Sequence, residues 1–286
     1  MWKLLLKLLI SFITTISAFV PILIFVGIDD YSKLVLLIES NNTVPIIVIS
    51  ICIFIGFSIG GYIHESNKTQ LKAEKMHAIF HDLRDNGLRD NSTIDHTTRN
   101  IFDFINKIST QKFNVCIKTF NFEESKCYDN YDSIKELELK TLSRASVNGD
   151  RKDDSKKHIV NNNTDFRSIL FKEECNIYAC SNLIMYRVLN EILNPDMQYE
   201  NSDTKYYKKY LASIVIPIRI NKEKIAKSYE NCKCICYNSY ITIGFLCIDT
   251  KLPISGSLKR EISGAAKAIA DSMFYPLFDF YNKDNK

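Results

Sequence analysis

Hydrophobic residues near the N-terminus form two long runs without a charged residue, at about 8–28 and 43–63. Each run has roughly the 20 residues that an α-helix needs to cross a lipid bilayer. The first run is longer than the apolar part of a cleaved signal peptide, and no small-x-small cleavage site follows it. The pattern therefore predicts a transmembrane hairpin in residues 1–63, with helices at about 8–28 and 43–63.

The charges that flank these runs predict their orientation. Lysines come before the first run and after the second, whereas the short loop between the runs is mainly acidic. Since positively charged residues stay on the cytoplasmic side of a membrane, both termini are expected in the cytoplasm. The chain is thus predicted to be a multi-pass protein of the cell (inner) membrane, with the lipid bilayer as a partner.

After the second run, the pattern changes to that of an amphipathic helix. Residues 64–90 are expected to form a helical linker that continues the second span and stops at Asn86-Gly87. The apolar face of this linker, and a small-xxx-small pair in the second span that permits close helix approach, predict a homo-oligomer. The expected interface residues are Gly56, Gly60, Met76, Ile79, Phe80 and Leu83.

Residues 91–286 alternate between helical and strand-like patterns, which is typical of an α+β domain. Residues 94–108 carry apolar side chains at helical spacing, and residues 112–120 and 136–143 alternate as strands do, with a slip expected near Lys140. The polar residues 148–163 are expected to form a loop, and the segments 163–171 and 182–192 are expected to form helices.

The end of the domain carries the clearest strand signals. Residues 213–219 and 240–249 are short, rich in β-branched residues and almost continuously apolar, as is typical of strands buried on both faces. From Ser257 onward, apolar residues recur about every 3.6 positions, which predicts an amphipathic helix. Together these segments predict a central sheet that is covered by a helix.

Pro217 in the first of these strands, and the run from Gly244 to Asp249 in the second, resemble the corresponding part of GAF domains. The resemblance is clear in the last third of the chain and looser from about Ile94 onward. It implies a cytosolic sensory domain at 91–286, of α+β fold, with a central antiparallel sheet covered by helices. The set of residues associated with cyclic-nucleotide binding in that family is not found, because Asn221-Lys222 alone does not make it.

In GAF-like folds a strand and a short helix border the ligand pocket, and polar residues flank those elements here. An Arg grips a carboxylate or phosphate with a forked pair of donors, Asn, Thr and Asp exchange hydrogen bonds, and a Phe stacks on a ring. The same residue types also cap helices and shape loops, so a purely structural role is the alternative. The predicted ligand-binding residues are Arg144, Asn163, Thr164, Asp165, Phe166 and Asn182.

Composition and motifs narrow the function further. The net charge of +4 comes from scattered Lys and Arg residues, so a nucleic-acid partner is not expected. Residues His81 to Arg84 resemble the phosphoacceptor box of sensor histidine kinases, but no ATP-site motif follows them. The chain also lacks P-loop, G-x-S-x-G and H-E-x-x-H motifs. Neither an enzyme nor a cofactor is therefore predicted.

The cysteines leave one question open. Nine cysteines without a regular framework suggest a reducing compartment. Cys232, Cys234 and Cys236 form a C-x-C-x-C run, whose thiols share one face if the segment is a strand. Metal sites usually combine C-x₂₋₄-C pairs, so the run predicts either a cysteine-rich hairpin tip or a site completed through the fold. The available partners are Cys127, Cys175 and Cys180.

These patterns together predict a membrane-anchored sensory or regulatory protein. The GAF-like domain would bind an unidentified small ligand or protein partner, and the signal would pass through the linker helix to oligomeric membrane hairpins. The alternative is a membrane-disrupting effector of a bacterial anti-phage defence system, triggered by a signal that the cytosolic domain binds.

Overall fold

A computed structural model describes residues 43–122, 126–147, 158–172, 176–193, 199–203, 206–224 and 232–283. The chain divides into two compact units, Met1–Leu71 and Lys72–Lys286, and each is described by itself. The first predicted span, residues 8–28, lies outside the described residues.

Helix α3 (Thr43–Asp85) covers the second predicted span and most of the predicted linker. No helix in the described part of the chain contains an apolar stretch long enough to cross a membrane. The helix ends at the predicted stop: the amides of Asn86 and Gly87 donate to the carbonyls of Asp82 and Leu83, and Gly87 has a φ of 60°. A glycine tolerates this left-handed backbone, which commonly ends a helix.

Within its described residues, the second unit has a mixed sheet of eight strands at its centre. Strand β8 (Tyr240–Thr250) pairs with β6 (Ala212–Asn221) on one side, and with β7 (Cys234–Tyr237) and β1 (Asn114–Phe120) on the other. Beyond β1 lie β3 (Glu138–Ala145) and β4 (His158–Ile159), and beyond β6 lies β5 (Tyr178–Cys180). All these pairs are antiparallel, and only β2 (Cys127–Tyr128) pairs in parallel, with β7. The predicted α+β class with a central antiparallel sheet is confirmed.

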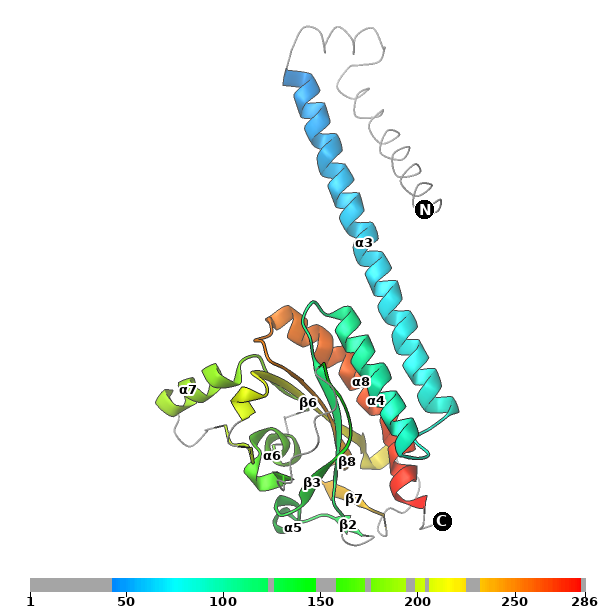
Figure 1. Ribbon diagram of the computed structural model, residues 1–286, viewed down its shortest axis with the longest axis vertical. Helices are drawn as coiled ribbons and strands as arrows, with labels where there is room; N and C mark the ends of the chain where they lie inside the picture. The colour runs from blue at the N-terminus through cyan, green and yellow to red at the C-terminus, as the bar shows by residue number, and fades with distance from the viewer. Residues whose placement is uncertain are drawn as a thin grey trace. The chain divides into compact units, whose positions relative to one another are not determined.

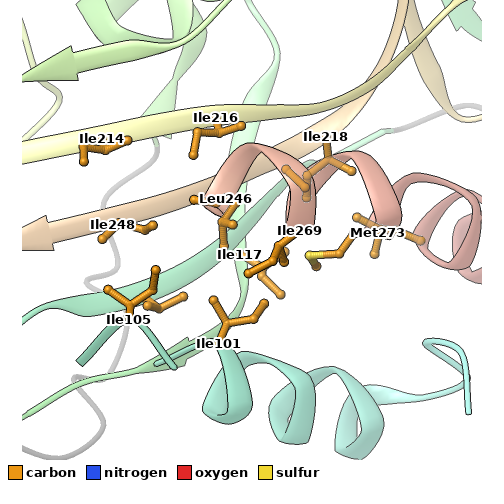
Figure 2. Packing of buried hydrophobic residues seen from close by; sticks show 14 of the residues in the cluster. Ile101, Ile105, Ile117, Ile214, Ile216, Ile218, Leu246, Ile248, Ile269 and Met273 are labelled. Carbon is orange, nitrogen blue, oxygen red and sulfur yellow. The ribbon is translucent and has the colours of Figure 1, made fainter. Parts of the chain in front are cut away.

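Two long helices, α4 (Asn91–Ile108) and α8 (Gly256–Tyr281), cover one face of this sheet (Figure 1). The larger apolar core lies between them and the strands. Its side chains come from β1, β6, β8, α4 and α8, and include Ile117, Ile216, Leu246, Ile101 and Ile269 (Figure 2). Because the helix-facing residues alternate with residues of the opposite face, the core strands are buried on both sides, as predicted.

The opposite face is covered by shorter elements. Helices α5 (Tyr131–Lys135), α6 (Thr164–Phe171) and α7 (Leu183–Leu193) lie on this side, with 3₁₀ turns at Val160–Asn162 and Tyr206–Lys208. A further 3₁₀ turn, Lys222–Lys224, directly follows β6. A second core forms here, in which Phe166 of α6 packs against Phe245 of β8 with ring centroids 4.8 Å apart.

The C-terminal turns of α3 belong to the larger core. Ile79 and Leu83 are 4% and 2% exposed, and Met76 and Phe80 are half-buried against the same cluster. These four residues were predicted to face another copy of the chain, but in one copy they already pack on the domain's own helices and strands. Gly56 and Gly60 are the rest of the predicted interface. A Cβ atom added to either glycine would meet no neighbouring atom within 4 Å.

A polar cavity between the sheet and helix α6 as candidate functional site

A cavity of about 290 Å³ opens on the sheet face that α6 covers. Its walls come from strands β1, β3, β4, β6 and β8, from the start of α6, and from residues between 201 and 210. This size is at the lower end of the volumes typical of small-molecule sites. The lining is unusually polar for a space beside an apolar core, with lysine, arginine, aspartate and cysteine side chains.

Strand register builds the floor of the cavity. Cys116 of β1 lies opposite Arg144 of β3 on one side and opposite Cys247 of β8 on the other, and Cys247 lies opposite Val215 of β6. These four residues therefore form a row across four neighbouring strands, and all four line the cavity. Lys118, two residues after Cys116, points to the same face because side chains alternate along a strand.

Two cationic side chains meet at this floor. Lys118 is 8% exposed, and its Nζ donates a hydrogen bond of 3.1 Å to Oγ1 of Thr141. The guanidinium of Arg144 lies 3.9 Å from Sγ of Cys116. A third cation, Lys209, sits at the rim in an ion pair of 2.6 Å with Asp203. Lys118 and Arg144 therefore bring positive charge to a partly enclosed floor, where charge interactions are stronger than in bulk water.

The two thiols of the floor form a coupled pair. A hydrogen bond with Cys247, and the positive charges of Lys118 and Arg144, lower the pKa of Cys116 against the opposing effect of burial. The same hydrogen bond, together with burial, raises the pKa of Cys247. When this pair loses a proton, Cys116 is therefore the thiol that becomes the thiolate.

Helix α6 supplies one of the three aspartates that line the cavity. Asp165 is 4% exposed, and its Oδ1 accepts a hydrogen bond of 2.9 Å from the amide of Phe166. Burial raises the pKa of Asp165 to about 6, although that amide and the charge of Lys118 oppose the shift. The carboxyl group thus exchanges its proton close to neutral pH, within the influence of the charge of Lys118.

Residues just before Asp165 fix the start of α6. The side-chain amide of Asn163 donates to the carbonyl of Ile159 at 2.6 Å and to the hydroxyl of Ser202 at 2.8 Å. The hydroxyl of Thr164 accepts a hydrogen bond of 2.8 Å from the amide of Glu200. These bonds hold the segment around residue 200 against α6, so the position of Asp165 is well determined.

The structure brings four of the six predicted ligand-binding residues to one cavity: Arg144, Asn163, Asp165 and Phe166. Thr164 does not line the cavity, and its hydroxyl instead accepts the hydrogen bond from the amide of Glu200. Asn182 lies elsewhere, where its Oδ1 accepts from the amide of Met185 and caps α7. For these two residues, the capping and loop role that the sequence left open is the one observed.

Sequence reasoning missed Lys118, Cys116 and Cys247. For Lys118 and Cys116, the signal is present in the segment Asn114–Phe120, where a polar or sulfur-containing residue alternates with Val115 and Ile117. Within an apolar strand, such an alternation marks a second buried face with a different chemistry.

No family model matches the sequence, and a search of curated proteins finds no match. Among solved structures, the chain is similar to the GAF domain of an Acinetobacter phosphoenolpyruvate-protein phosphotransferase, at 9% identity and a TM-score of 0.44, over 72% of this chain and 92% of that one. It is similar to the chromophore-binding domain of a bacteriophytochrome from R. palustris, at 9% identity and a TM-score of 0.43, over 76% and 63% of the chains.

A third similar structure is the phycoerythrobilin-bound GAF domain of a cyanobacterial phytochrome, at 12% identity and a TM-score of 0.40, over 74% of this chain and 97% of that one. The resemblance to GAF domains noted in the sequence thus recurs among solved structures. At these identities and TM-scores it carries no argument about a ligand or an activity.

Proposed function

We propose that this chain is a sensory or regulatory protein whose second unit binds a small organic anion in the cavity beside α6. The observation that carries the proposal is the placement of Lys118 and Arg144 in that cavity, next to the buried carboxyl group of Asp165. An anionic group of the ligand would lie against the two cations. A hydrogen-bond donor of the ligand would face Asp165, and an apolar part would pack on Phe166.

The energetics of buried charge support a ligand of this kind. A lysine ammonium has three hydrogens to donate, and among the described residues Lys118 donates to one acceptor, Thr141. Removing a charged group from water is costly unless a partner of opposite charge replaces the lost hydration. Asp165 contributes one nearby negative charge to Lys118, and a carboxylate or phosphate would add further acceptors for Lys118 and a forked pair of acceptors for Arg144.

The same strands offer a route from the cavity to the linker helix. Lys118 lines the cavity, while its neighbour Ile117 packs in the core that also contains Ile79 and Leu83 of α3. A shift of β1 on ligand binding would therefore be felt by the end of α3. We propose that the signal leaves the domain along this helix, and that residues N-terminal to it anchor the protein in a membrane as an oligomer.

The test is a thermal-shift measurement on the purified full chain with a panel of small carboxylates and organic phosphates. A member of the panel that binds in the cavity should raise the melting temperature of the wild-type protein. The variants Arg144→Ala and Lys118→Met should each abolish most of that shift, because a hydrogen bond to a charged group contributes about 1.5–3 kcal/mol.

Matched controls use exposed cations of the same type on α4, namely Arg99→Ala and Lys107→Met. These two variants should retain the full shift. Absence of a shift with every member of both classes would contradict the proposal. A shift that survives in both cavity variants would contradict it as well, since the anion would then bind elsewhere.

A further inference from the structure

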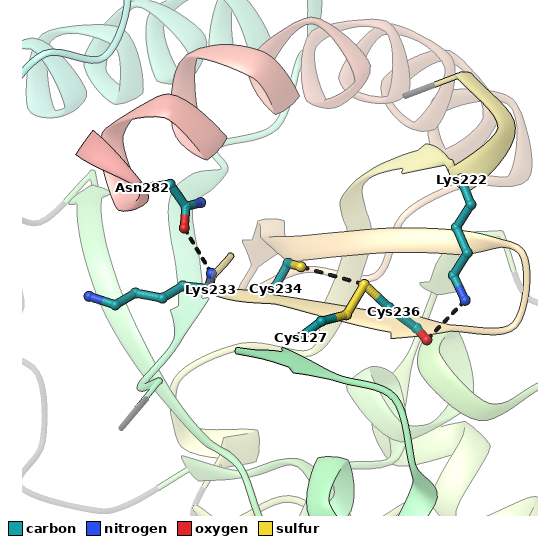
Figure 3. The surroundings of a disulfide bond; sticks show 6 residues. All are labelled: Cys127, Lys222, Lys233, Cys234, Cys236 and Asn282. Atoms are coloured by element: carbon teal, nitrogen blue, oxygen red, sulfur yellow. Dashed lines mark hydrogen bonds between the residues drawn. A yellow bond between two sulfur atoms is a disulfide. The ribbon is translucent and has the colours of Figure 1, made fainter. Parts of the chain in front are cut away.

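A second group of reactive side chains lies at the junction of β2 and β7. The sulfur atoms of Cys127, Cys234 and Cys236 all lie within 4.8 Å of one another (Figure 3). Cys127 and Cys236 are joined by a disulfide, with their Cα atoms 6.0 Å apart. The third sulfur, of Cys234, lies 3.5 Å from that of Cys236.

Local structure explains how three sulfurs come together. Cys234 and Cys236 are two residues apart on β7, so their side chains point to the same face. The parallel pairing of β2 with β7 places Cys127 opposite Cys234. Of the partners that the sequence allowed for the C-x-C-x-C run, the fold selects Cys127; Cys180 lies in a separate cluster with Tyr199 and Tyr206, and Cys175 is outside the described residues.

We propose that, in the reduced protein, Cys127, Cys234 and Cys236 bind one zinc ion, and that this site and the Cys127–Cys236 disulfide exclude each other. Zinc holds thiolate sulfurs at about 2.3 Å in a tetrahedral arrangement, which separates neighbouring sulfurs by roughly 3.8 Å. The sulfur of Cys234 lies 3.5 Å from that of Cys236 and within 4.8 Å of that of Cys127, and these two distances bracket that value. Three sulfurs leave one position of the ion for water or for Cys232, two residues before Cys234.

The surroundings suit a negatively charged metal centre. A zinc ion with three thiolates carries a net charge of −1, and the Nζ of Lys222 lies 3.0 Å from the carbonyl oxygen of Cys236 (Figure 3). The amide of Lys233 donates to Oδ1 of Asn282, the residue that caps α8, at 2.8 Å. Cys234 is 0% exposed and Cys236 is 4% exposed, so the strand that would supply two ligands is fixed before any metal binds.

The site is separate from the ligand cavity. Cys234 and Cys236 belong to the larger core, on the sheet face that α4 and α8 cover. Cys116 and Cys247 belong to the second core, which borders the cavity on the opposite face. The proposal therefore does not depend on which anion the cavity binds, or on whether it binds one.

Conversion of the zinc-bound form to the disulfide form balances in electrons and protons. The thiolates of Cys127 and Cys236 give up two electrons and form the S–S bond, while the O–O bond of a peroxide breaks and takes up two electrons and two protons to give two waters. The zinc ion leaves, and the thiolate of Cys234 takes a proton from water. The reverse step needs a thiol or phosphine reductant, after which zinc binding releases the thiol protons.

The test uses the full chain, reduced with a phosphine, freed of metal with a chelator and kept without oxygen. Cobalt(II) is added as a spectroscopic substitute for zinc. One equivalent per chain should produce the thiolate-to-cobalt charge-transfer band in the near ultraviolet, and zinc should displace it. Peroxide should remove the band, and peptide mapping should then recover the Cys127–Cys236 disulfide.

Cys234→Ser and Cys127→Ser should each weaken cobalt binding by at least about 100-fold, since loss even of a residue that only supports a ligand costs 10–100-fold. The control, Cys180→Ser on β5, should bind as the wild type does. If Cys234→Ser still forms the Cys127–Cys236 disulfide on oxidation, its β2–β7 junction is intact and the loss of metal is local. A wild-type protein without the band, or a band of equal strength in both ligand variants or after oxidation, would overturn the proposal.

Discussion

Asp165 lowers the stability of the folded protein at neutral pH. Its folded-state pKa of about 6 lies above the ordinary value of 3.8, because burial disfavours the charged form. Between pH 4 and pH 6 the folded chain therefore binds more protons at this site than the unfolded chain does. By linkage, the free energy of unfolding falls as pH rises through this window, by about 2–3 kcal/mol in all, and levels off above pH 6.

Asp165→Asn should therefore be more stable than the wild type at pH 7, by about 2–3 kcal/mol, since the amide oxygen still accepts from Phe166 and carries no charge. Chemical denaturation at pH 4, 5, 6 and 7 measures this. The difference between the two proteins should grow from near zero at pH 4 to its full value above pH 6. Asp103→Asn, at an exposed position on α4, should show no such trend, and a parallel pH profile for Asp165→Asn would contradict the assignment.

Residue types near α6 were predictable because their chemistry is local. Asp165 and Phe166 begin a short helix, and Arg144 directly follows the predicted strand 136–143. The resemblance to GAF domains then implied that these elements border a pocket. Lys118 and Cys116 were not predictable in the same way. Their place depends on the pairing of β1 with both β3 and β8, and such long-range register is not written in any one segment.

Among the elements, the end of α3 shows what an amphipathic pattern does and does not specify. The pattern correctly marks Ile79 and Leu83 as a buried face, but it does not name what covers them. The sequence interpretation placed a second copy of the chain there, whereas the domain's own core occupies that place. A hydrophobic stripe gains free energy from leaving water, whichever surface replaces the water.

This difference predicts how two adjacent substitutions behave. Ile79→Asp puts a charge into the core and should lower the free energy of unfolding of the second unit by at least about 3 kcal/mol. Ala78→Asp, one residue earlier and exposed, should change it by less than about 0.5 kcal/mol. Thermal unfolding followed by circular dichroism reports the stability, and light scattering reports the size. Full stability of Ile79→Asp with a loss of self-association would show that this face belongs between copies.

Two details of the sheet show where the strand prediction needed tertiary information. The expected slip near Lys140 is a shift in the pairing of β3 with β1, opposite Ile117 and Lys118. Because of this shift, Leu142 packs against the larger core under α4 and α8, whereas Leu137 and Leu139 lie in the second core on the opposite face. Gly244, singled out by the GAF resemblance, lies where an added Cβ would collide with the backbone carbonyl of Lys118. The glycine is thus explained by the close approach of β1 to β8.

At the scale of the whole molecule, self-association is the prediction that the monomer structure leaves to experiment. With Ile79 and Leu83 used by the domain core, the glycine pair in α3 is the remaining part of the predicted interface. Gly56 and Gly60 are four residues apart, so they lie on the same side of the helix, and the space around each is open. Small residues promote helix association by allowing the helix backbones to approach closely.

We therefore expect the full chain to form a homo-oligomer in lipid bilayers that Gly56→Leu weakens, because the leucine side chain keeps the backbones apart. Gly61→Leu is the matched control, since Gly61 is also open but is rotated by about 100° from Gly60 around the helix axis. Energy transfer between donor- and acceptor-labelled chains in vesicles, measured over a range of protein-to-lipid ratios, gives the association constant for each variant. A loss confined to Gly56→Leu would locate the contact on the face of the glycine pair. Equal losses in both variants, or monomers in the wild type at every ratio, would show that α3 does not associate through these glycines.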